Sequence, residues 1–490
     1  VLVLLLLRRY SSRLFLSFGT TFGVALLIAT TIPRLGIDFL REPTVLAVAG
    51  MFLVLGIIEA SRRIKTTRSK MAFVVGFLAL IVVGFVALDM LGVVGALEDK
   101  FISAIFPSER MGEGIIQQLV QSVQEHKPAT WGSFYYDLGI GILFVPIGLF
   151  FALQNPTNRN IFLVIFGLTA IYFAGSMVRL TLLMAPAVSL LWALALVQLV
   201  KPFVTILREN PQMPRRKMRF RSRVGKEFSA AFIILMFLLL TVTFVLPSAG
   251  ANNPRVIDRA NSPTTIAASS LPIRAQVSDW LDTLNWMRVN LNESDVVASW
   301  WDYGYWITAI GNKTTLVDNG TINATQISLV GQMFMSNETG AIEILERFNE
   351  RGEYNITHVL VFHTFATDGS KIYDAGYGDE GKWRWMARIG GLDDNKYGNS
   401  TLGVDWVDTN DDGQPQDDEL IVNERGNSTV IYKLMHYARE TLVYGSSDIQ
   451  LEHFEPVYFS QKSGQELQWY QRSATEQFAA VVCVYKVNYD

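Results

Sequence analysis

The sequence predicts a polytopic α-helical membrane domain followed by a mixed α/β extracytoplasmic domain whose C-terminal part is rich in strands. Half of the residues are hydrophobic and the mean hydropathy is +0.24. This is too apolar for a soluble protein of this length and too polar for a fully embedded one. Long apolar runs stop near Pro247, and the rest is rich in Asp, Asn, Trp and Tyr. We therefore place the two domains at residues 1–249 and 250–490.

The membrane half contains apolar runs long enough to span a bilayer. Basic residues cluster in the loops at 8–13, 61–70 and 201–226. The positive-inside rule places these loops in the cytoplasm, so the loop at 97–135 and everything after residue 249 lie outside. A nucleic-acid or phospholipid surface is the alternative for the basic run within the third loop. The predicted spans are residues 14–31, 44–60, 71–96, 136–153, 160–178, 182–200 and 228–248.

The opening VLVLLLL, from Val1, is too short to span a bilayer, which takes ~20 residues. We expect the chain to begin inside a helix, with part of the protein preceding it; a signal peptide is the alternative. Cys483 is the one cysteine, which excludes a disulfide framework and a cysteine-based metal site. The net charge of −3 argues against a nucleic-acid partner.

In the outer half, patterns of strand and helix alternate. Apolar residues at helical spacing predict a helix over 273–291. Short buried strands are expected at 295–299, 314–318 and 356–362, with helices near 324–334 and 340–351 between them. This alternation indicates a small α/β layer, in which ligands gather at the carboxyl ends of the strands. The aromatic stretch SWWDYG follows the first strand directly.

Two polar side chains stand out on the outer side of the membrane half. Glu125 lies in the loop sequence SVQEHKPATW, where a solvated loop residue is the simpler interpretation. Arg179 lies where one apolar run meets the next at the outer face. It is either an interfacial anchor or an anion site for a lipid phosphate, whose oxygens match the guanidinium donors.

The outer domain carries a second polar motif, DEGKWRWM. Asp379, Lys382 and Met386 are spaced to share one helix face. The alternative is a surface ion pair beside a core methionine.

An acidic stretch, DTNDDGQPQDDE, matches the pattern of a calcium loop. Hard oxygen ligands at alternating positions, a glycine for the turn and a final carboxylate are what calcium requires. The flanks read as strands, so we expect an isolated structural calcium loop, with a solvated Asp/Asn-rich turn as the alternative. The predicted ligands are Asp408, Asn410, Asp412, Gln414 and Glu419.

Together these motifs resemble the catalytic subunit of oligosaccharyltransferase, the enzyme of asparagine-linked glycosylation. WWDYG at Trp300–Gly304 resembles the family signature, and SVQE at Ser122–Glu125 resembles its loop motif. DEGKWRWM fits the Asp-x-x-Lys-x-x-x-Met pattern of the archaeal and eukaryotic branches. The resemblance covers essentially the whole chain and implies a GT-C glycosyltransferase fold of archaeal type.

The departure from the family lies at the front of the chain. The resemblance implies that the early helices, with the metal ligands of their outer loops, are missing, so we expect this fragment to be inactive alone. Two rivals remain: another polytopic membrane glycosyltransferase, and a membrane receptor or transporter with an outer ligand-binding domain.

The resemblance also implies roles for the motif residues. Glu125 is the catalytic carboxylate and also a candidate ligand of a catalytic Mg or Mn ion. Arg179 binds the phosphate of a dolichyl phosphate or diphosphate donor of the glycan. The acceptor is a polypeptide with an Asn-x-Ser/Thr sequon, and the enzyme is a glycosyltransferase of the hexosyltransferase class.

We expect the protein in the plasma membrane rather than the endoplasmic reticulum. The residues implied to bind the sequon are Trp300, Trp301, Asp302, Lys382 and Met386.

Overall fold

The computed structural model divides the chain into two compact units, which we describe separately. The first comprises Val1–Ile105, Leu143–Thr169 and Pro186–Thr205, and the second comprises Phe106–Ile142, Ala170–Ala185 and Ile206–Asp490. The predicted domain boundary after residue 249 stays a prediction. The structure describes residues 1, 4–5, 9–32, 36–90, 106–110, 112, 114–208, 225–247, 253–261, 271, 276–350, 356–408, 416, 419–461 and 467–489.

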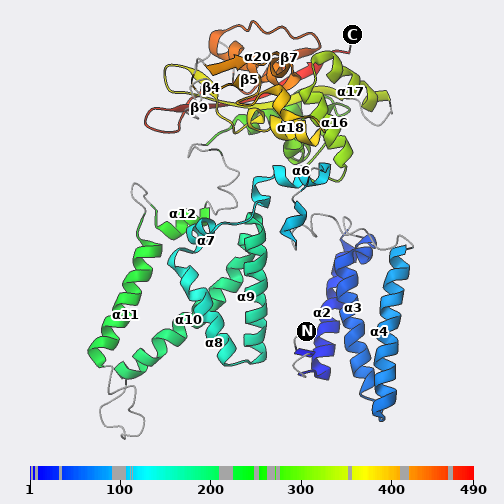
Figure 1. Ribbon diagram of the computed structural model, residues 1–490, viewed down its shortest axis with the longest axis vertical. Helices are drawn as coiled ribbons and strands as arrows, with labels where there is room; N and C mark the ends of the chain where they lie inside the picture. Colours follow the sequence, from blue (N-terminus) through cyan, green and yellow to red (C-terminus); the bar gives the residue numbers. More distant parts are fainter. Residues whose placement is uncertain are drawn as a thin grey trace. The chain divides into compact units, whose positions relative to one another are not determined.

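Apolar helices dominate the N-terminal part (Figure 1). Within the described residues, six helical stretches are long and apolar enough to cross a membrane. The run predicted at 71–96 forms part of α4, whose apolar stretch covers Met71–Gly84, and residues 91–96 lie outside the described residues. The bounds are α2 Ser12–Thr31, α3 Pro43–Ser61, α4 Thr67–Met90, α7 Trp131–Leu138, α8 Phe144–Gln154, α9 Asn158–Ser176, α10 Thr181–Arg208, α11 Lys226–Leu240 and α12 Arg255–Asn261.

Local sequence explains how the helices of the first unit begin and how closely they pack. Ser11 caps α2 by accepting a hydrogen bond from Leu14 N, and Pro43 opens α3, where its missing N–H is not needed. A Cβ at Gly148 of α8 would lie 2.3 Å from Leu191 O of α10. Glycine therefore permits a close approach of two helices, as is common in membranes.

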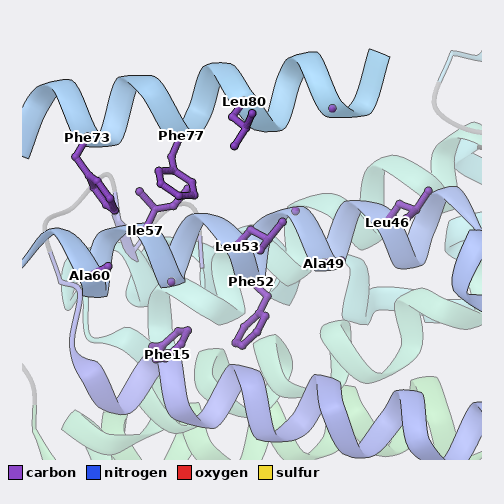
Figure 2. Close-up of a pocket in the computed structure, with 13 residues that line it drawn as sticks. Phe15, Leu46, Ala49, Phe52, Leu53, Ile57, Ala60, Phe73, Phe77 and Leu80 are labelled. Carbon is purple, nitrogen blue, oxygen red and sulfur yellow. The ribbon is translucent and has the colours of Figure 1, made fainter. Parts of the chain in front are cut away.

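An apolar cavity of about 620 Å³ lies among α2, α3 and α4. Figure 2 shows Phe73, Phe77 and Leu80 of α4 directed toward α3. On the other side of α3, the rings of Phe15 and Phe52 stack with centroids 5.2 Å apart. The cavity is lined by apolar residues, so it offers no group for chemistry.

A seven-stranded mixed sheet forms the centre of the second unit, as the described residues show it. Its order is β2-β1-β3-β9-β7, with β4 pairing β3 and β8 pairing β9. The three N-terminal strands run parallel, while β9 is antiparallel to both β3 and β7. The bounds are β1 Val296–Ala298, β2 Thr314–Thr315, β3 Ile356–Thr367, β4 Ile372–Asp374, β7 Phe454–Phe459, β8 Tyr470–Gln471 and β9 Gln477–Val487; β5 Val404–Trp406 and β6 Leu420–Val422 form a separate pair.

Helices cover both faces of this sheet. Successive residues of a strand point to opposite faces. Phe362 of β3 packs its ring against Trp280 of α14, whereas the next residue, His363, contacts Met435 O of α20. The helices are α6 Ile115–Ser122, α14 Asp279–Asn290, α15 Gly304–Ala309, α16 Ala324–Met335, α17 Glu338–Glu350, α18 Trp383–Ile389, α19 Glu424–Asn427 and α20 Val430–Tyr444.

The predicted fold class is confirmed: apolar helices are followed by a strand-rich α/β domain. The buried strand expected at 356–362 continues to Thr367, because β9 pairs with it as far as Gln477. The helix expected over 273–291 is described only from Asp279. The strands expected on both sides of the acidic loop are β5 and β6.

Candidate functional site

The WWDYG motif forms a tight turn at the carboxyl end of β1. The 3-10 helix Trp301–Tyr303 leads into α15 at Gly304. A Cβ on Gly304 would lie 2.5 Å from both Val317 O and Asp318 Cα. Such distances to backbone atoms require glycine, so this turn packs directly on the segment that follows β2.

Asn319 fixes the turn from the same segment. Its side-chain amide donates to Asp302 O at 2.8 Å and accepts from Tyr305 N at 3.0 Å. One asparagine therefore holds the backbone at Asp302 and again three residues further along the chain.

The Asp302 carboxylate belongs to a chain of polar contacts that reaches into the core. Lys382 Nζ lies 2.7 Å from Asp302 Oδ2 and donates to Tyr303 Oη at 2.9 Å. Tyr303 Oη in turn donates to Asp379 Oδ1 at 2.7 Å, and Asp379 Oδ2 accepts from Phe362 N of β3 at 2.8 Å. The Asp302 and Lys382 side chains are 30% and 26% exposed, whereas Asp379 is fully buried. The contacts thus run from the surface to the central strand.

Burial shifts the acidity of the two inner members. It raises the pKa of Asp379 to about 6, against the opposing effect of the Lys382 charge. Burial, followed by the charges of Asp379 and Asp302, raises the pKa of Tyr303 well above its ordinary value. At neutral pH the Tyr303 phenol therefore keeps its proton and donates a hydrogen bond to the ionised Asp379.

The structure brings Asp302 and Lys382 together but places the other predicted sequon-binding residues in the core. Trp300, Trp301 and Met386 are 1%, 6% and 0% exposed. Whether these three contact a ligand stays a prediction. Sequence reasoning did not assign a role to Tyr303, although it stands inside the motif.

The expected single helix face of the DEGKWRWM motif is wrong in one respect. Asp379 lies in a 3-10 turn, and α18 begins only after Lys382. The reason is that Asp379 accepts hydrogen bonds from β3 and Tyr303, which directs it into the core rather than along a helix. A surface ion pair between Asp379 and Lys382, the alternative from the sequence, is also wrong because Asp379 is buried and Lys382 pairs with Asp302.

Glu125 and Arg179 form the second polar cluster. Arg179 Nε donates to Glu125 Oε2 at 2.8 Å, and the two side chains are 53% and 24% exposed in that order. The backbone joins the same segments, because Val178 N donates to Lys127 O at 2.9 Å. Two residues that the sequence singled out separately therefore meet.

Arg110 anchors this loop, and sequence reasoning missed it. It is 6% exposed, and its guanidinium donates to His126 O and Ser176 O at 2.6 Å each. A buried arginine that binds two carbonyls 50 residues apart leaves no periodic signal, so only the structure reveals it.

His126, next to Glu125, is uncharged near neutral pH. Burial lowers its pKa to about 4, and the Arg179 charge adds to this effect. Its Nδ1 donates to Val120 O at 3.0 Å, which ties the loop back to α6.

Helix α6 links this loop to the domain that carries Asp302. It packs against α16 and α18 (Figure 1), and Leu119 is buried in the core of the domain. Val123, two residues before Glu125, also packs against this core. The loop with Glu125 is therefore anchored on helices of the α/β domain.

The described residues do not fit a catalytic metal. Among them, no group of three or more His, Cys, Asp or Glu could hold an ion. Glu125 is paired with Arg179 instead.

Only part of the acidic loop lies within the described residues. The predicted calcium ligands Asn410, Asp412 and Gln414 lie outside the described residues. Glu419 is buried and accepts a hydrogen bond from Trp406 Nε1 at 3.0 Å. Calcium binding stays a prediction.

A multi-helix membrane domain followed by an α/β domain that carries the Asp302–Lys382 ion pair defines a class of polytopic membrane protein with a large globular domain. Residues 1–192 match the family model "Oligosaccharyl transferase STT3, N-terminal", and residues 293–359 match "STT3/PglB/AglB core domain". The chain belongs to the STT3/PglB/AglB oligosaccharyltransferase family.

Relatives of known function support this membership. The STT3B subunit of a dolichyl-diphosphooligosaccharide–protein glycosyltransferase from rice is 31% identical over 410 residues, which are 80% of this chain and 55% of that protein. The STT3 subunit from Dictyostelium discoideum is 28% identical over 79% of this chain and 52% of its own length. The chain thus spans about half the length of these relatives.

A solved structure supports the fold alone. The Archaeoglobus fulgidus oligosaccharyltransferase, tethered to an acceptor peptide with an NVT sequon, covers 86% of this chain and 47% of its own. Its TM-score is 0.50 at 17% identity.

Proposed function

We propose that the chain forms the acceptor-recognising and part of the catalytic machinery of an oligosaccharyltransferase. The reaction would move a glycan from a lipid-linked donor to the side-chain amide of asparagine in Asn-x-Ser/Thr. The observation that carries this proposal is the partly exposed Asp302 carboxylate, held by Lys382 in the same unit as the Glu125–Arg179 pair. The names of the curated relatives support it.

Asp302 would select the acceptor. Lys382 engages Oδ2, and among the described residues no hydrogen bond involves Oδ1. That oxygen would accept the hydroxyl of the Ser/Thr two residues after the asparagine. A site built around a substrate hydroxyl rejects an analogue without it by ~10⁴-fold.

Glu125 would act on the asparagine. An amide nitrogen is a poor nucleophile because its lone pair is delocalised into the carbonyl. A carboxylate that accepts hydrogen bonds from this nitrogen favours the twisted amide, in which the lone pair is free to attack the anomeric carbon. Glu125 is 24% exposed and so within reach of a substrate.

Arg179 would bind the donor. A guanidinium carries five N–H donors, of which Nε serves Glu125. The remaining donors suit the oxygens of a lipid phosphate, whose charge grows as the glycan leaves.

Three further assignments are part of the proposal. A divalent ion, Mg or Mn, is the cofactor that the resemblance implies, and the described residues alone offer no group of three ligands for it. Calcium in the Asp408–Glu419 loop is tested by calorimetry of the protein before and after Asp408→Ala. The plasma membrane of an archaeon is the proposed location, tested by cell fractionation; the plant relatives are no support for it.

The test is transfer to Asn-x-Thr and Asn-x-Ala peptides in membranes with added Mn. Because the chain spans about half of its relatives, it is assayed alone and joined to the part of a relative that it does not span. The joined protein should transfer to the Thr peptide and not to the Ala peptide, whereas the chain alone should be inactive. In the joined protein, Asp302→Ala should abolish the preference, while Asp282→Asn, at an exposed site on α14, should not. Equal transfer to both peptides by the unaltered protein would sink the proposal.

A further inference from the structure

The strongest unassigned feature is the hydroxyl group of Tyr303. Tyr303 is only 4% exposed, yet its hydroxyl oxygen lies between the buried Asp379 carboxylate and the partly exposed Lys382 ammonium. We propose that the Tyr303 hydroxyl is a positioning group: it holds the Lys382 ammonium against Asp302 and so sets the carboxylate that reads the acceptor hydroxyl. This inference rests on the proposed function and adds a residue to it.

The direction of each hydrogen bond follows from the partners. An ionised carboxylate only accepts and an ammonium only donates. The Tyr303 hydroxyl must therefore donate a hydrogen bond to Asp379 Oδ1, at 2.7 Å, and accept one from Lys382 Nζ, at 2.9 Å. The phenol has one proton, so both bonds fix its orientation.

The anchor of this arrangement is the sheet. Asp379 Oδ2 accepts from Phe362 N in the middle of β3 at 2.8 Å, and Asp379 is fully buried. The Tyr303 ring is packed edge-on against Phe362 and tilted against Trp280. The hydroxyl oxygen thus has little freedom to move.

Lysine needs such an anchor because its side chain is long. Holding it in one rotamer costs conformational entropy. Tyr303 supplies two contacts, the hydrogen bond and a ring face whose centroid lies 4.4 Å from Nζ. Lys382 then reaches Asp302 Oδ2 at 2.7 Å, leaving Oδ1 for the acceptor.

Removal of the hydroxyl predicts a specific failure. In Tyr303→Phe the ring stays, but Asp379 Oδ1 loses its donor. A buried carboxylate without that donor attracts the nearest cation, so Lys382 turns from Asp302 toward Asp379. Asp302 loses its fixed orientation, and the preference for a hydroxyl in the acceptor falls.

The experiment measures binding, not transfer. The chain in detergent or nanodiscs is titrated with fluorescent peptides that contain Asn-Val-Thr or Asn-Val-Val, because valine has the shape of threonine without its hydroxyl. The readout is the dissociation constant of the Asn-Val-Val peptide divided by that of the Asn-Val-Thr peptide, so a high ratio means a strong preference for the hydroxyl. Misfolding lowers the fraction of active protein but not this ratio.

Tyr303→Phe should lower the ratio about 10-fold, the value of one hydrogen bond to a charged group. Asp379→Asn, which keeps the shape but removes the anion, should lower it in the same direction. The matched control is Tyr485→Phe, which removes another buried hydroxyl, donating to Leu434 O at 2.6 Å in the same domain. Its ratio should stay at that of the unaltered protein.

The outcomes separate the two proposals. If the unaltered protein binds both peptides equally, the assignment of Asp302 as the reader fails. If it prefers threonine and Tyr303→Phe keeps the full preference, the Asp302 assignment stands and the positioning role of Tyr303 is overturned.

Discussion

Two carboxylates, Asp302 and Glu125, each pair with one cation, but their supports differ. Asp302 is connected through Lys382, Tyr303 and Asp379 to the backbone of the central strand. Glu125 pairs with Arg179, whose side chain is half exposed. Exposed ion pairs contribute little to stability, about 0–1 kcal/mol. The Asp302–Lys382 pair is therefore tied to the folding core, whereas the Glu125–Arg179 pair lies in a partly exposed loop.

The largest expected effect separates activity from stability at the loop. Glu125→Gln should lower kcat about 1,000-fold, within the range for removal of a general base. The melting temperature should change little, because the pair with Arg179 is partly exposed. Both quantities are measured on the same preparation of the chain joined to the part of a relative that it does not span: kcat from transfer kinetics, and the melting temperature from a melting curve.

Glu343→Gln, at an exposed position of α17, is the control for that variant. Normal transfer by Glu125→Gln would remove the catalytic assignment, and a large fall in melting temperature would remove the contrast between loop and pocket.

The second effect tests the pocket by its packing. Gly304→Ala places a Cβ 2.5 Å from backbone atoms of Val317 and Asp318, which cannot yield as side chains do. We expect a loss of ~3 kcal/mol in the free energy of unfolding, the upper range for overpacking. Gly175→Ala, where a Cβ meets open space, should be close to neutral in the same denaturation experiment.

What the sequence predicts well is local. The strand before WWDYG and the strands around the acidic loop follow from apolar patterns over a few residues. The contacts that complete the site are not local: Tyr303 and Asp379 are 76 positions apart, and Arg110 binds Ser176 across 66. No periodicity records such pairs, so the roles of Glu125 and Lys382 came only from the family resemblance, and Arg110 was not found at all.

The third effect uses pH to examine the pocket. The pKa of Asp379 is about 6 in the folded chain, above its ordinary 3.8. The folded state therefore binds more protons than the unfolded state between these values, and the penalty for the buried charge disappears as the pH falls from 7 toward 4. The change is ~3 kcal/mol at most, from about two pKa units.

Asp379→Asn isolates this contribution, because other groups titrate over the same window. In urea unfolding, the free energy of unfolding of the unaltered protein should rise relative to that of the variant between pH 7 and pH 5. A difference independent of pH would mean that Asp379 is not the group that titrates.

The smallest effect is the opposite response of the loop. The pKa of His126 is about 4, below its ordinary 6.5, so the folded loop resists protonation and loses stability as the pH falls through this interval. Protonation opposes the nearby Arg179 charge and requires water at a buried ring. Hydrogen exchange at the backbone of Gln124–Lys127 should become faster as the pH falls from 6.5 to 4.5, after correction for intrinsic rates, while β3 stays protected.

The control is His126→Asn, which retains a side-chain donor for Val120 O and cannot become charged, so its loop should show no such acceleration. If the loop of this variant loosens equally, the acid sensitivity arises from another group, and the two regions do not differ in their response to pH through His126.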